Sequence, residues 1–283
     1  MIHSLNPLPL CRTIVLVSLG LLGACAHPGP DVVAITGGAG SGGGGTVITF
    51  AIADLDGDWV GKLLPNDVVR PESNFYLRIA GGAVTEAANS LGHEWTAVDS
   101  TRSLDFSEVG AMASVLESTV YSNSMSLDAQ MDDAMTMLTG TYSHLLADGS
   151  LVTGSFTLMR SSGAGHFNVS ILGGDWAGHG SNLTGKKRTL TFAIADDGSV
   201  ESGVMTHPLT LVDDHTYSLG AGSFAFADDS IGRLDDVVFA GDDGSILTFT
   251  YLLVDEDGTL LAGPAFDTLY SAGLVELLRP AAE

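Results

Sequence analysis

The chain has 283 residues, of which 34 are acidic and only 11 are lysine or arginine, so its formal net charge is −23. A chain this acidic is a poor partner for nucleic acid or for an anionic membrane surface. With only two cysteines, it also lacks the composition of a disulfide-rich scaffold.

The N-terminus carries an apolar run, "TIVLVSLGLL" at 13–22, which follows the basic residue Arg12. This run is typical of the hydrophobic region of a signal peptide and is too short to be a permanent membrane span. It continues into "LGAC", which ends at Cys25 and resembles the lipobox of bacterial lipoproteins. The resemblance implies cleavage after a signal peptide of residues 1–24 and acylation of Cys25. Ala26 in the next position implies the outer membrane. The alternative is ordinary secretory cleavage with Cys25 incidental.

Cleavage at this point has two consequences for the mature chain. Cys11 leaves with the leader, so no disulfide remains possible and stability must come from burial of apolar surface. Arg12 leaves too, which makes the net charge more negative by one.

Residues 25–46 are rich in proline and then glycine, which is typical of a flexible tether between an anchor and a domain. Within them Gly38, Gly40 and Gly43 match the G-x-G-x-x-G pattern of dinucleotide-binding sites. That site needs a helix directly after the glycines. The following residues, "TVITFAIAD" at 46–54, are instead alternating β-formers, so we interpret the glycines as linker.

The rest of the chain has the pattern of antiparallel β-structure. Apolar residues alternate with others in "FYLRI" at 75–79 and "LTFAI" at 190–194, the period of half-buried strands. Asp-Gly turn signals separate such runs and supply the positive φ of tight hairpins. Residues 107–136 also contain short stretches of helical character, and we predict strand or loop there.

A phrase with tryptophan occurs twice, "GDWVG" at 57–61 and "GDWAG" at 174–178. Two further pairs follow in the same order. They are "IAGGAV" at 79–84 with "IADDGSV" at 194–200, and "TYSHLLADGSLVTG" at 141–154 with "TYLLVDEDGTLLAG" at 250–263. Three matches in one order predict a duplicated unit. We therefore expect two β-domains, 47–165 and 166–283.

The G-x-W phrase near the start of each unit resembles the first-strand signature of the lipocalins and the wider calycin group. In that family the tryptophan packs across the closed end of the barrel, and an arginine from the last strand often lies over it. The resemblance implies two pairs, Trp59 with Arg160 and Trp176 with Arg279. An inward guanidinium needs a partner, and an indole face is a good one. We therefore expect these tryptophans to be structural.

These features predict an all-β protein with two tandem small antiparallel β-barrels of lipocalin-like type, or β-sandwiches, after a signal peptide and a glycine-rich linker. The expected inward side chains are bulky, among them Phe75, Leu77, Phe192 and Ile194. Bulky interiors favour barrels filled by side chains.

Few residues suggest a catalytic or metal-binding role. The run "DLDGD" at 54–58 imitates a calcium loop but has tryptophan and proline where the EF-hand requires glycine and glutamate. His93 beside Glu94, or His215 beside two aspartates, could in principle form an acid–base pair. Neighbouring residues on a strand point to opposite faces, which argues against a shared site for such a pair. No zinc spacing, serine elbow or cysteine nucleophile is present. We expect no enzyme, no cofactor and no metal site.

The sequence therefore predicts a lipid-anchored protein of the bacterial cell envelope, in the outer membrane, that acts by non-catalytic binding. The expected partner is a small apolar ligand or another envelope protein, with no role for nucleic acid. The alternative is a structural, scaffolding or surface-receptor lipoprotein with filled barrels. A ligand-binding barrel needs a cavity of about 300 Å³ or more.

Overall fold

The computed structural model describes residues 48–96, 98–119, 122–182, 187–207, 215–220, 222–268 and 271–280. The predicted signal peptide and the predicted linker lie outside these ranges. Residues 47–283 form one compact unit. In the ranges described, no helix combines the length and the apolar character needed to cross a bilayer.

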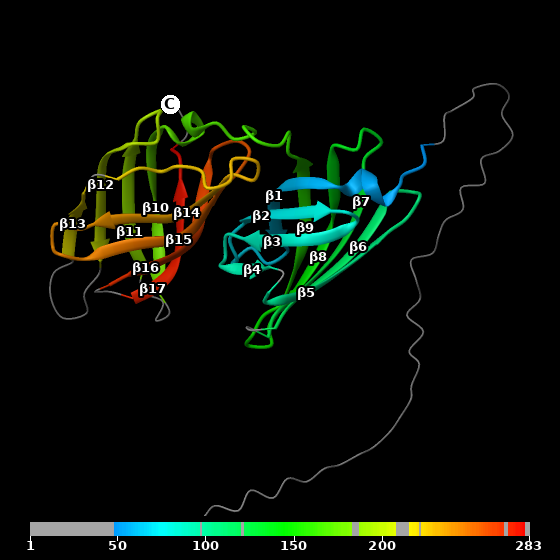
Figure 1. Ribbon diagram of the computed structural model, residues 1–283. Helices are drawn as coiled ribbons and strands as arrows, with labels where there is room; N and C mark the ends of the chain where they lie inside the picture. Colours follow the sequence, from blue (N-terminus) through cyan, green and yellow to red (C-terminus); the bar gives the residue numbers. More distant parts are fainter. Residues whose placement is uncertain are drawn as a thin grey trace, which may run out of the picture. The chain divides into compact units, whose positions relative to one another are not determined.

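The first half of the compact unit is a nine-stranded antiparallel sheet in the order β4-β3-β2-β1-β9-β8-β7-β6-β5, which curls into a nearly closed barrel (Figure 1). Its strands are β1 (Gly57–Pro65), β2 (Ser73–Ala80), β3 (Ala83–Asn89), β4 (His93–Trp95), β5 (Ser100–Phe106), β6 (Ala111–Ser118), β7 (Ser124–Met131), β8 (Met137–Leu145) and β9 (Leu151–Arg160). Residues 107–136 thus supply β6, β7 and the turns beside them, in agreement with the prediction of strand or loop.

The second half is an eight-stranded sheet in the order β13-β12-β11-β10-β17-β16-β15-β14. Its strands are β10 (Gly174–Asn182), β11 (Lys187–Ile194), β12 (Val200–His207), β13 (His215–Leu219), β14 (Arg233–Ala240), β15 (Ile246–Val254), β16 (Leu260–Asp267) and β17 (Ser271–Leu278). The two sheets confirm the prediction of two tandem antiparallel barrels.

The hairpin turns follow from local chemistry. The four predicted Asp-Gly turns place Gly149, Gly198, Gly244 and Gly258 at φ between +61° and +86°, a region that favours glycine. Each turn joins two neighbouring antiparallel strands, as at Leu145↔Leu151 across the β8–β9 turn.

The strand order also corrects one of the three sequence matches. Counted forward from the strand with the tryptophan, β1 to β4 correspond to β10 to β13. Counted back from the last strand of each barrel, β9 to β6 correspond to β17 to β14. Strand β5 of the first barrel then has no counterpart in the second. The phrase at 141–154 spans the β8–β9 hairpin, whereas the phrase at 250–263 spans β15–β16, one hairpin earlier in its barrel. That match was wrong, because Asp-Gly hairpins share a turn chemistry wherever they occur.

The segment before β1 is a second correction. "TVITFAIAD" has β-forming residues, yet Ile52–Leu55 is a short 3₁₀ helix, η1, and Val169–Leu172 forms a second one, η2, before β10. Asp54 fixes η1 because its carboxylate accepts the backbone N–H of Ala51 at 2.7 Å. Phe50, just before η1, and Leu55, its last residue, are buried in the core of the first barrel.

The inward faces are those that the alternation predicts. Phe75 and Leu77 are buried in the first barrel, and Phe192 and Ile194 in the second. The outward residue Tyr76, in contrast, is only 1% exposed, because it packs with the core of the second barrel. Periodicity alone predicts a half-buried strand here and misses the burial of its second face.

Candidate functional site

The η1 end of the first barrel carries the predicted pair of Trp59 and Arg160. The two residues are register partners on β1 and β9, and the guanidinium carbon lies 4.6 Å from the centre of the indole ring. Trp59 Nε1 donates to the carbonyl oxygen of Leu55 at 2.8 Å, and Arg160 donates to the carbonyl oxygens of Asp54 and Asp56. The pair therefore holds η1 against the end of the barrel.

The second barrel repeats this arrangement around η2. Arg279 Cζ lies 4.8 Å from the ring centre of Trp176, whose Nε1 donates to the carbonyl oxygen of Leu172 at 2.7 Å. Arg279 donates in turn to the carbonyl oxygen of Ile171. Both tryptophans are at most 1% exposed and are tied to their own barrel, a structural arrangement.

The opposite end of the first barrel is hollow. A pocket of about 340 Å³ opens there, at the strand ends farthest from Trp59 and Arg160. Its walls combine apolar and uncharged polar side chains with one arginine: Leu63, Pro65, Arg70, Pro71, Ser73, Asn89, Leu91, His93, Tyr142, His144, Leu146, Val152 and Leu274. A mostly apolar hollow with a few convergent polar groups is the usual form of a small-molecule site.

Two histidines meet in this pocket. The ring centres of His93 on β4 and His144 on β8 are 4.6 Å apart in an edge-to-face arrangement, and Asn123 Nδ2 lies 2.9 Å from Nδ1 of His93. An amide nitrogen only donates, so Nδ1 of His93 accepts and its proton resides on Nε2. Burial lowers the pKa of His93, and burial together with the charges of His93 and Arg70 lowers the pKa of His144 to about 3. Both rings are therefore neutral at pH 7.

Several buried polar atoms around the pocket lack a hydrogen-bond partner within the described chain. They include His144 Nε2, Asn89 Nδ2 and, behind His144, Trp95 Nε1. Asn89 is fully buried, and its Oδ1 accepts the backbone N–H groups of Leu91 and His93 at 3.0 and 3.2 Å. Those two bonds fix the amide, so Nδ2 is an unused donor. Each such buried atom costs about 1–3 kcal/mol when it has no partner, and all three have almost no accessible surface.

The charge of the pocket differs from that of the whole chain. No aspartate or glutamate is among the residues that line it, although the chain has 34 acidic residues. Arg70 lies at its mouth, and among the described arginines it alone has no hydrogen bond or ion pair at its guanidinium. The lining of the pocket is thus uncharged apart from Arg70.

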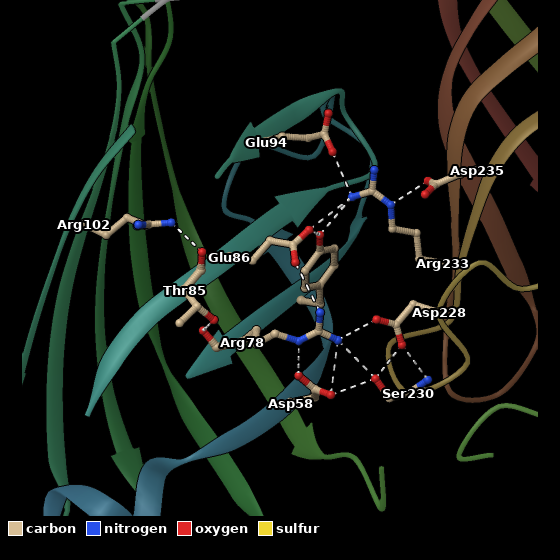
Figure 2. A network of polar contacts seen from close by, with 11 residues as sticks. Asp58, Arg78, Thr85, Glu86, Glu94, Arg102, Asp228, Ser230, Arg233 and Asp235 are labelled. Carbon is tan, nitrogen blue, oxygen red and sulfur yellow. Dashed lines mark hydrogen bonds and ion pairs between the residues drawn. The ribbon is translucent and has the colours of Figure 1, made fainter. Parts of the chain in front are cut away.

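The second barrel supports one wall of this pocket. Tyr251 donates its hydroxyl to the carbonyl oxygen of Asn89 at 2.8 Å, at the start of the β3–β4 hairpin. Arg233 reaches Glu94 at 2.8 Å, directly after His93 (Figure 2). Leu274 of β17 lines the pocket itself. Asn89 and His93 are therefore held in place by residues far away in the sequence.

A second cluster of charges joins the barrels away from the pocket. Arg78 on β2 pairs with Asp58 on β1 and with Asp228 of the second half, each at 2.6 Å, and Ser230 donates to Asp58 at 2.7 Å (Figure 2). Hydrogen bonding to Asp58 raises the pKa of Arg78, which stays charged. No sequence pattern indicates this cluster, because its members are distant in the chain.

The structure separates the other candidates from the sequence. Asp54 caps η1, Asp56 accepts the N–H groups of the β2–β3 turn at 2.9 and 3.0 Å, and Asp58 pairs with Arg78, so these carboxylates have different partners. His93 faces the pocket while Glu94 faces Arg233, as the strand argument predicts. The side chain of His215 and the aspartates before it lie outside the described residues.

Sequence reasoning did not find the pocket. His93 was considered only as a neighbour of Glu94, and no pattern indicated a role for His144, Asn89, Asn123 or Arg70. The sequence signal for the pocket was weak. It consists of polar residues at inward positions of strands whose other inward residues are apolar, such as His144 two positions after Tyr142.

A more open groove of about 410 Å³ lies beside this pocket, between the barrels. It shares Arg70, Pro71, Leu91 and Leu274 with the pocket and includes Glu276, whose pKa burial raises. We favour the pocket as the site, because it is less open than the groove and no acidic residue lines it, whereas Glu72 and Glu276 line the groove.

Comparisons with known proteins give the following. No family model and no curated protein matches the chain. Among solved structures, a redesigned β-barrel has 14% identity and a TM-score of 0.30, covering 41% of this chain and 96% of its own. A protein of unknown function of the DUF3598 family from Nostoc punctiforme has 13% identity and a TM-score of 0.27, and the match covers 82% of this chain and 100% of that protein. Kievitone hydratase from Nectria haematococca has 8% identity and a TM-score of 0.24, and the match covers 86% of this chain and 96% of that enzyme.

Proposed function

We propose that this protein binds a small, mainly apolar molecule in the pocket of the first barrel and does not act on it chemically. The observation that carries the proposal is the 340 Å³ pocket at the open end of the first barrel, whose lining is mostly apolar and contains no acidic residue. Its volume is within the range of ligand sites, about 300–1,000 Å³. Leu63, Leu146 and Val152 supply apolar surface for the body of the ligand, and the polar atoms fix its orientation.

We further propose that the protein is lipid-anchored through Cys25 in the outer membrane of the bacterial cell envelope. The support is the sequence alone: the lipobox-like "LGAC", the following Ala26 and the glycine-rich tether. Several acyl chains hold a domain stably on a membrane. Metabolic labelling with palmitate in a Gram-negative host tests this, with label expected on the wild type and none on Cys25→Ala. Label on both variants, or on neither, would contradict the anchor.

Native mass spectrometry tests ligand binding. Residues 47–283, purified without denaturant, are incubated with an organic extract of bacterial cells and then measured. We expect one small-molecule adduct per chain. A bare mass after this exposure would favour the alternative, a scaffolding or receptor protein that recognises partners through its surface.

A pair of neighbouring variants locates the adduct. Val152 lines the pocket, whereas Leu151 on the same strand is 61% exposed on the outer face. Val152→Trp fills the pocket and is expected to abolish the adduct, and Leu151→Trp is expected to retain it. Loss of the adduct in both, or in neither, would place binding elsewhere.

A further inference from the structure

The groove beside the pocket is a second hollow, and both barrels contribute to its walls. The loop between β1 and β2 supplies Val68, Val69 and Arg70, whereas β17 supplies Leu274 and Glu276. Its volume of about 410 Å³ is within the range of small-molecule sites. Such sites often lie where two domains meet, so the groove is a candidate for a binding function of its own.

Glu276 points into this groove from the outer face of β17. Its neighbours Val275 and Leu277 are buried in the core of the second barrel, so the alternation of the strand turns Glu276 outward. Its register partners on the two adjacent strands, His179 on β10 and Ala262 on β16, line the groove as well. This row of three residues therefore forms one wall of the groove.

The carboxylate of Glu276 is half-buried and lacks a cationic partner. No hydrogen bond or ion pair joins it to another side chain in the described part of the chain. Lys62 lies 3.9 Å from Glu72 but pairs with Asp255 at 2.7 Å. Burial raises the pKa of Glu276, the charge of His179 lowers it, and the charge of Glu72 raises it. Glu276 has thus lost part of its hydration without gaining a counter-charge.

Arg70 brings the opposite charge to the same groove. Its guanidinium has no hydrogen bond or ion pair with any described residue. By contrast, Arg78 and Arg233 pair with carboxylates, and Arg160 and Arg279 stack on indoles. An arginine without a carboxylate partner is unexpected in a chain with 34 acidic residues. Its planar fork of donors suits a carboxylate from a ligand.

Most of the remaining lining of the groove is apolar. Leu91, Ala262 and Leu274 belong to it, and Val68 and Val69 on the loop are 98% and 85% exposed. Exposed apolar side chains that gather at one hollow are typical of a binding surface. A ligand for this groove therefore needs apolar surface as well as charges of both signs.

We propose that the groove binds a short apolar peptide with two free ends, whose ammonium group is held by Glu276 and whose carboxylate is held by Arg70. The side chains of the peptide lie against Leu91, Leu274 and the exposed valines of the loop. The two groove charges are opposite in sign and both lack a partner, so a zwitterion matches them, whereas an amine or an acid alone uses only one. This site is separate from the pocket and does not depend on the ligand proposed there.

Three probes test the two ends: leucyl-leucine, its N-acetyl derivative and its C-terminal amide, each titrated calorimetrically into residues 47–283 at pH 7.0. Leucyl-leucine is expected to bind about tenfold or more tightly than either derivative, because each derivative lacks one charge-assisted hydrogen bond. Equal binding of the acetylated peptide, or no binding of any probe, would overturn the proposal. Equal binding of the amide would contradict the role of Arg70. None of these results bears on an adduct in the pocket.

Variants at the two charges sharpen this test. Glu276→Gln is expected to weaken leucyl-leucine about tenfold and leave the acetylated peptide unchanged, since that peptide has no ammonium group. Arg70→Gln is expected to weaken leucyl-leucine to the same degree and leave the amide unchanged. If Glu276→Gln fails to fold, Arg70→Gln on its exposed loop still decides. Wild-type affinity for leucyl-leucine in Arg70→Gln would contradict the pairing of that residue with the carboxylate.

Two control variants locate the peptide. Asp128→Asn makes the same change of charge as Glu276→Gln, but Asp128 is exposed on β7 and does not line the groove. Val152→Trp fills the pocket and leaves the groove open. Affinity for leucyl-leucine is expected to stay at the wild-type value in both. A loss in Asp128→Asn equal to that in Glu276→Gln would mean that net charge governs binding, and a loss in Val152→Trp would place the peptide in the pocket.

Discussion

The two barrels have the same closed end and different interiors. Each has a 3₁₀ helix held by a tryptophan and an arginine. In the second barrel the interior contains Phe192, Phe224, Phe239 and Phe249, whose ring centres are 5.3–6.3 Å apart. In the first barrel, two histidines and an asparagine stand at the open end beside a pocket.

The edges of the two sheets differ as well. In the second barrel, backbone groups join the edge regions: Leu219 pairs with Gly241, and Gly220 N–H donates to the carbonyl oxygen of Ala240 at 2.7 Å. In the first barrel, side chains bridge the edges, with Arg102 of β5 donating to the carbonyl oxygen of Thr85 in β3 (Figure 2). The second barrel is thus filled by aromatic rings, whereas the first has a pocket at its open end.

The largest effect is expected from emptying the filled barrel. Phe249 is fully buried among aromatic rings, so Phe249→Ala should lower the free energy of unfolding by about 3–5 kcal/mol. His144→Leu in the first barrel removes an unpartnered buried nitrogen and should leave stability unchanged or raised. Urea unfolding measures both. A large loss in His144→Leu would contradict the difference between the two interiors.

The next effect is a pH dependence located in the first barrel. In the folded protein the pKa of His144 is lowered to about 3, mainly because the ring is buried. In the unfolded chain the pKa of a histidine is about 6.5. Below pH 6.5 the unfolded chain takes up a proton that the folded chain does not. Stability should therefore fall as the pH decreases, by up to about 1.4 kcal/mol per pH unit.

Between pH 6.5 and 4.5 the lowered pKa values of His93 and His144 reduce stability as the pH falls, whereas the raised pKa of Glu276 acts in the opposite direction. The control is His144→Gln, in which the fall in stability should become shallower. An equally steep fall in the variant would assign the pH dependence to other groups.

The closed ends should respond alike in both barrels. Arg160→Ala and Arg279→Ala each remove a stack on indole and bonds to carbonyls of the 3₁₀ helix, so each should cost about 1–2 kcal/mol. Arg70→Ala, on an exposed loop, serves as the reference and should fall within about 0.5 kcal/mol of the wild type. If both stacked arginines behave like this reference, the resemblance to the calycin closing pair loses its main support.

The smallest effect tests how one barrel supports the other. Tyr251→Phe removes a single hydrogen bond to the Asn89 carbonyl, with an expected stability loss of about 1 kcal/mol. Because this bond holds Asn89 at one wall of the pocket, affinity for the small molecule taken up from the cell extract should also fall. Ser230→Ala removes a contact between the barrels that does not touch the pocket, and affinity should stay unchanged. An equal loss of affinity in both would contradict a specific role for Tyr251.

Local patterns predicted much of the fold. The alternation of apolar residues predicted the inward faces of β2 and β11, and the Asp-Gly pairs predicted the tight turns. The G-x-W phrase located β1 and β10. The 3₁₀ helix η1 was missed because the residues just before it are β-formers, and the burial of Phe50 and Leu55 overrides that local preference. The second buried face of β2 was missed because the other barrel covers it.

The candidate site was harder to predict for a physical reason. His93, Asn123 and His144 come from three segments that only the closure of the sheet brings together, and Arg70 lies on a loop without regular structure. No fixed spacing links such residues. The arginines over the tryptophans are different, because first and last strands pair in a small barrel and their register follows from its closure.

Nitrogen-15 NMR of the histidine rings, followed while the organic extract of bacterial cells is added to residues 47–283, tests the central claim most directly. We expect the signals of His93 and His144 to shift in proportion to occupancy, whereas the signal of His166, which pairs with Glu256 outside the pocket, stays in place. Unmoved signals of His93 and His144, or shifts at His166 alone, would contradict a ligand site in the first barrel.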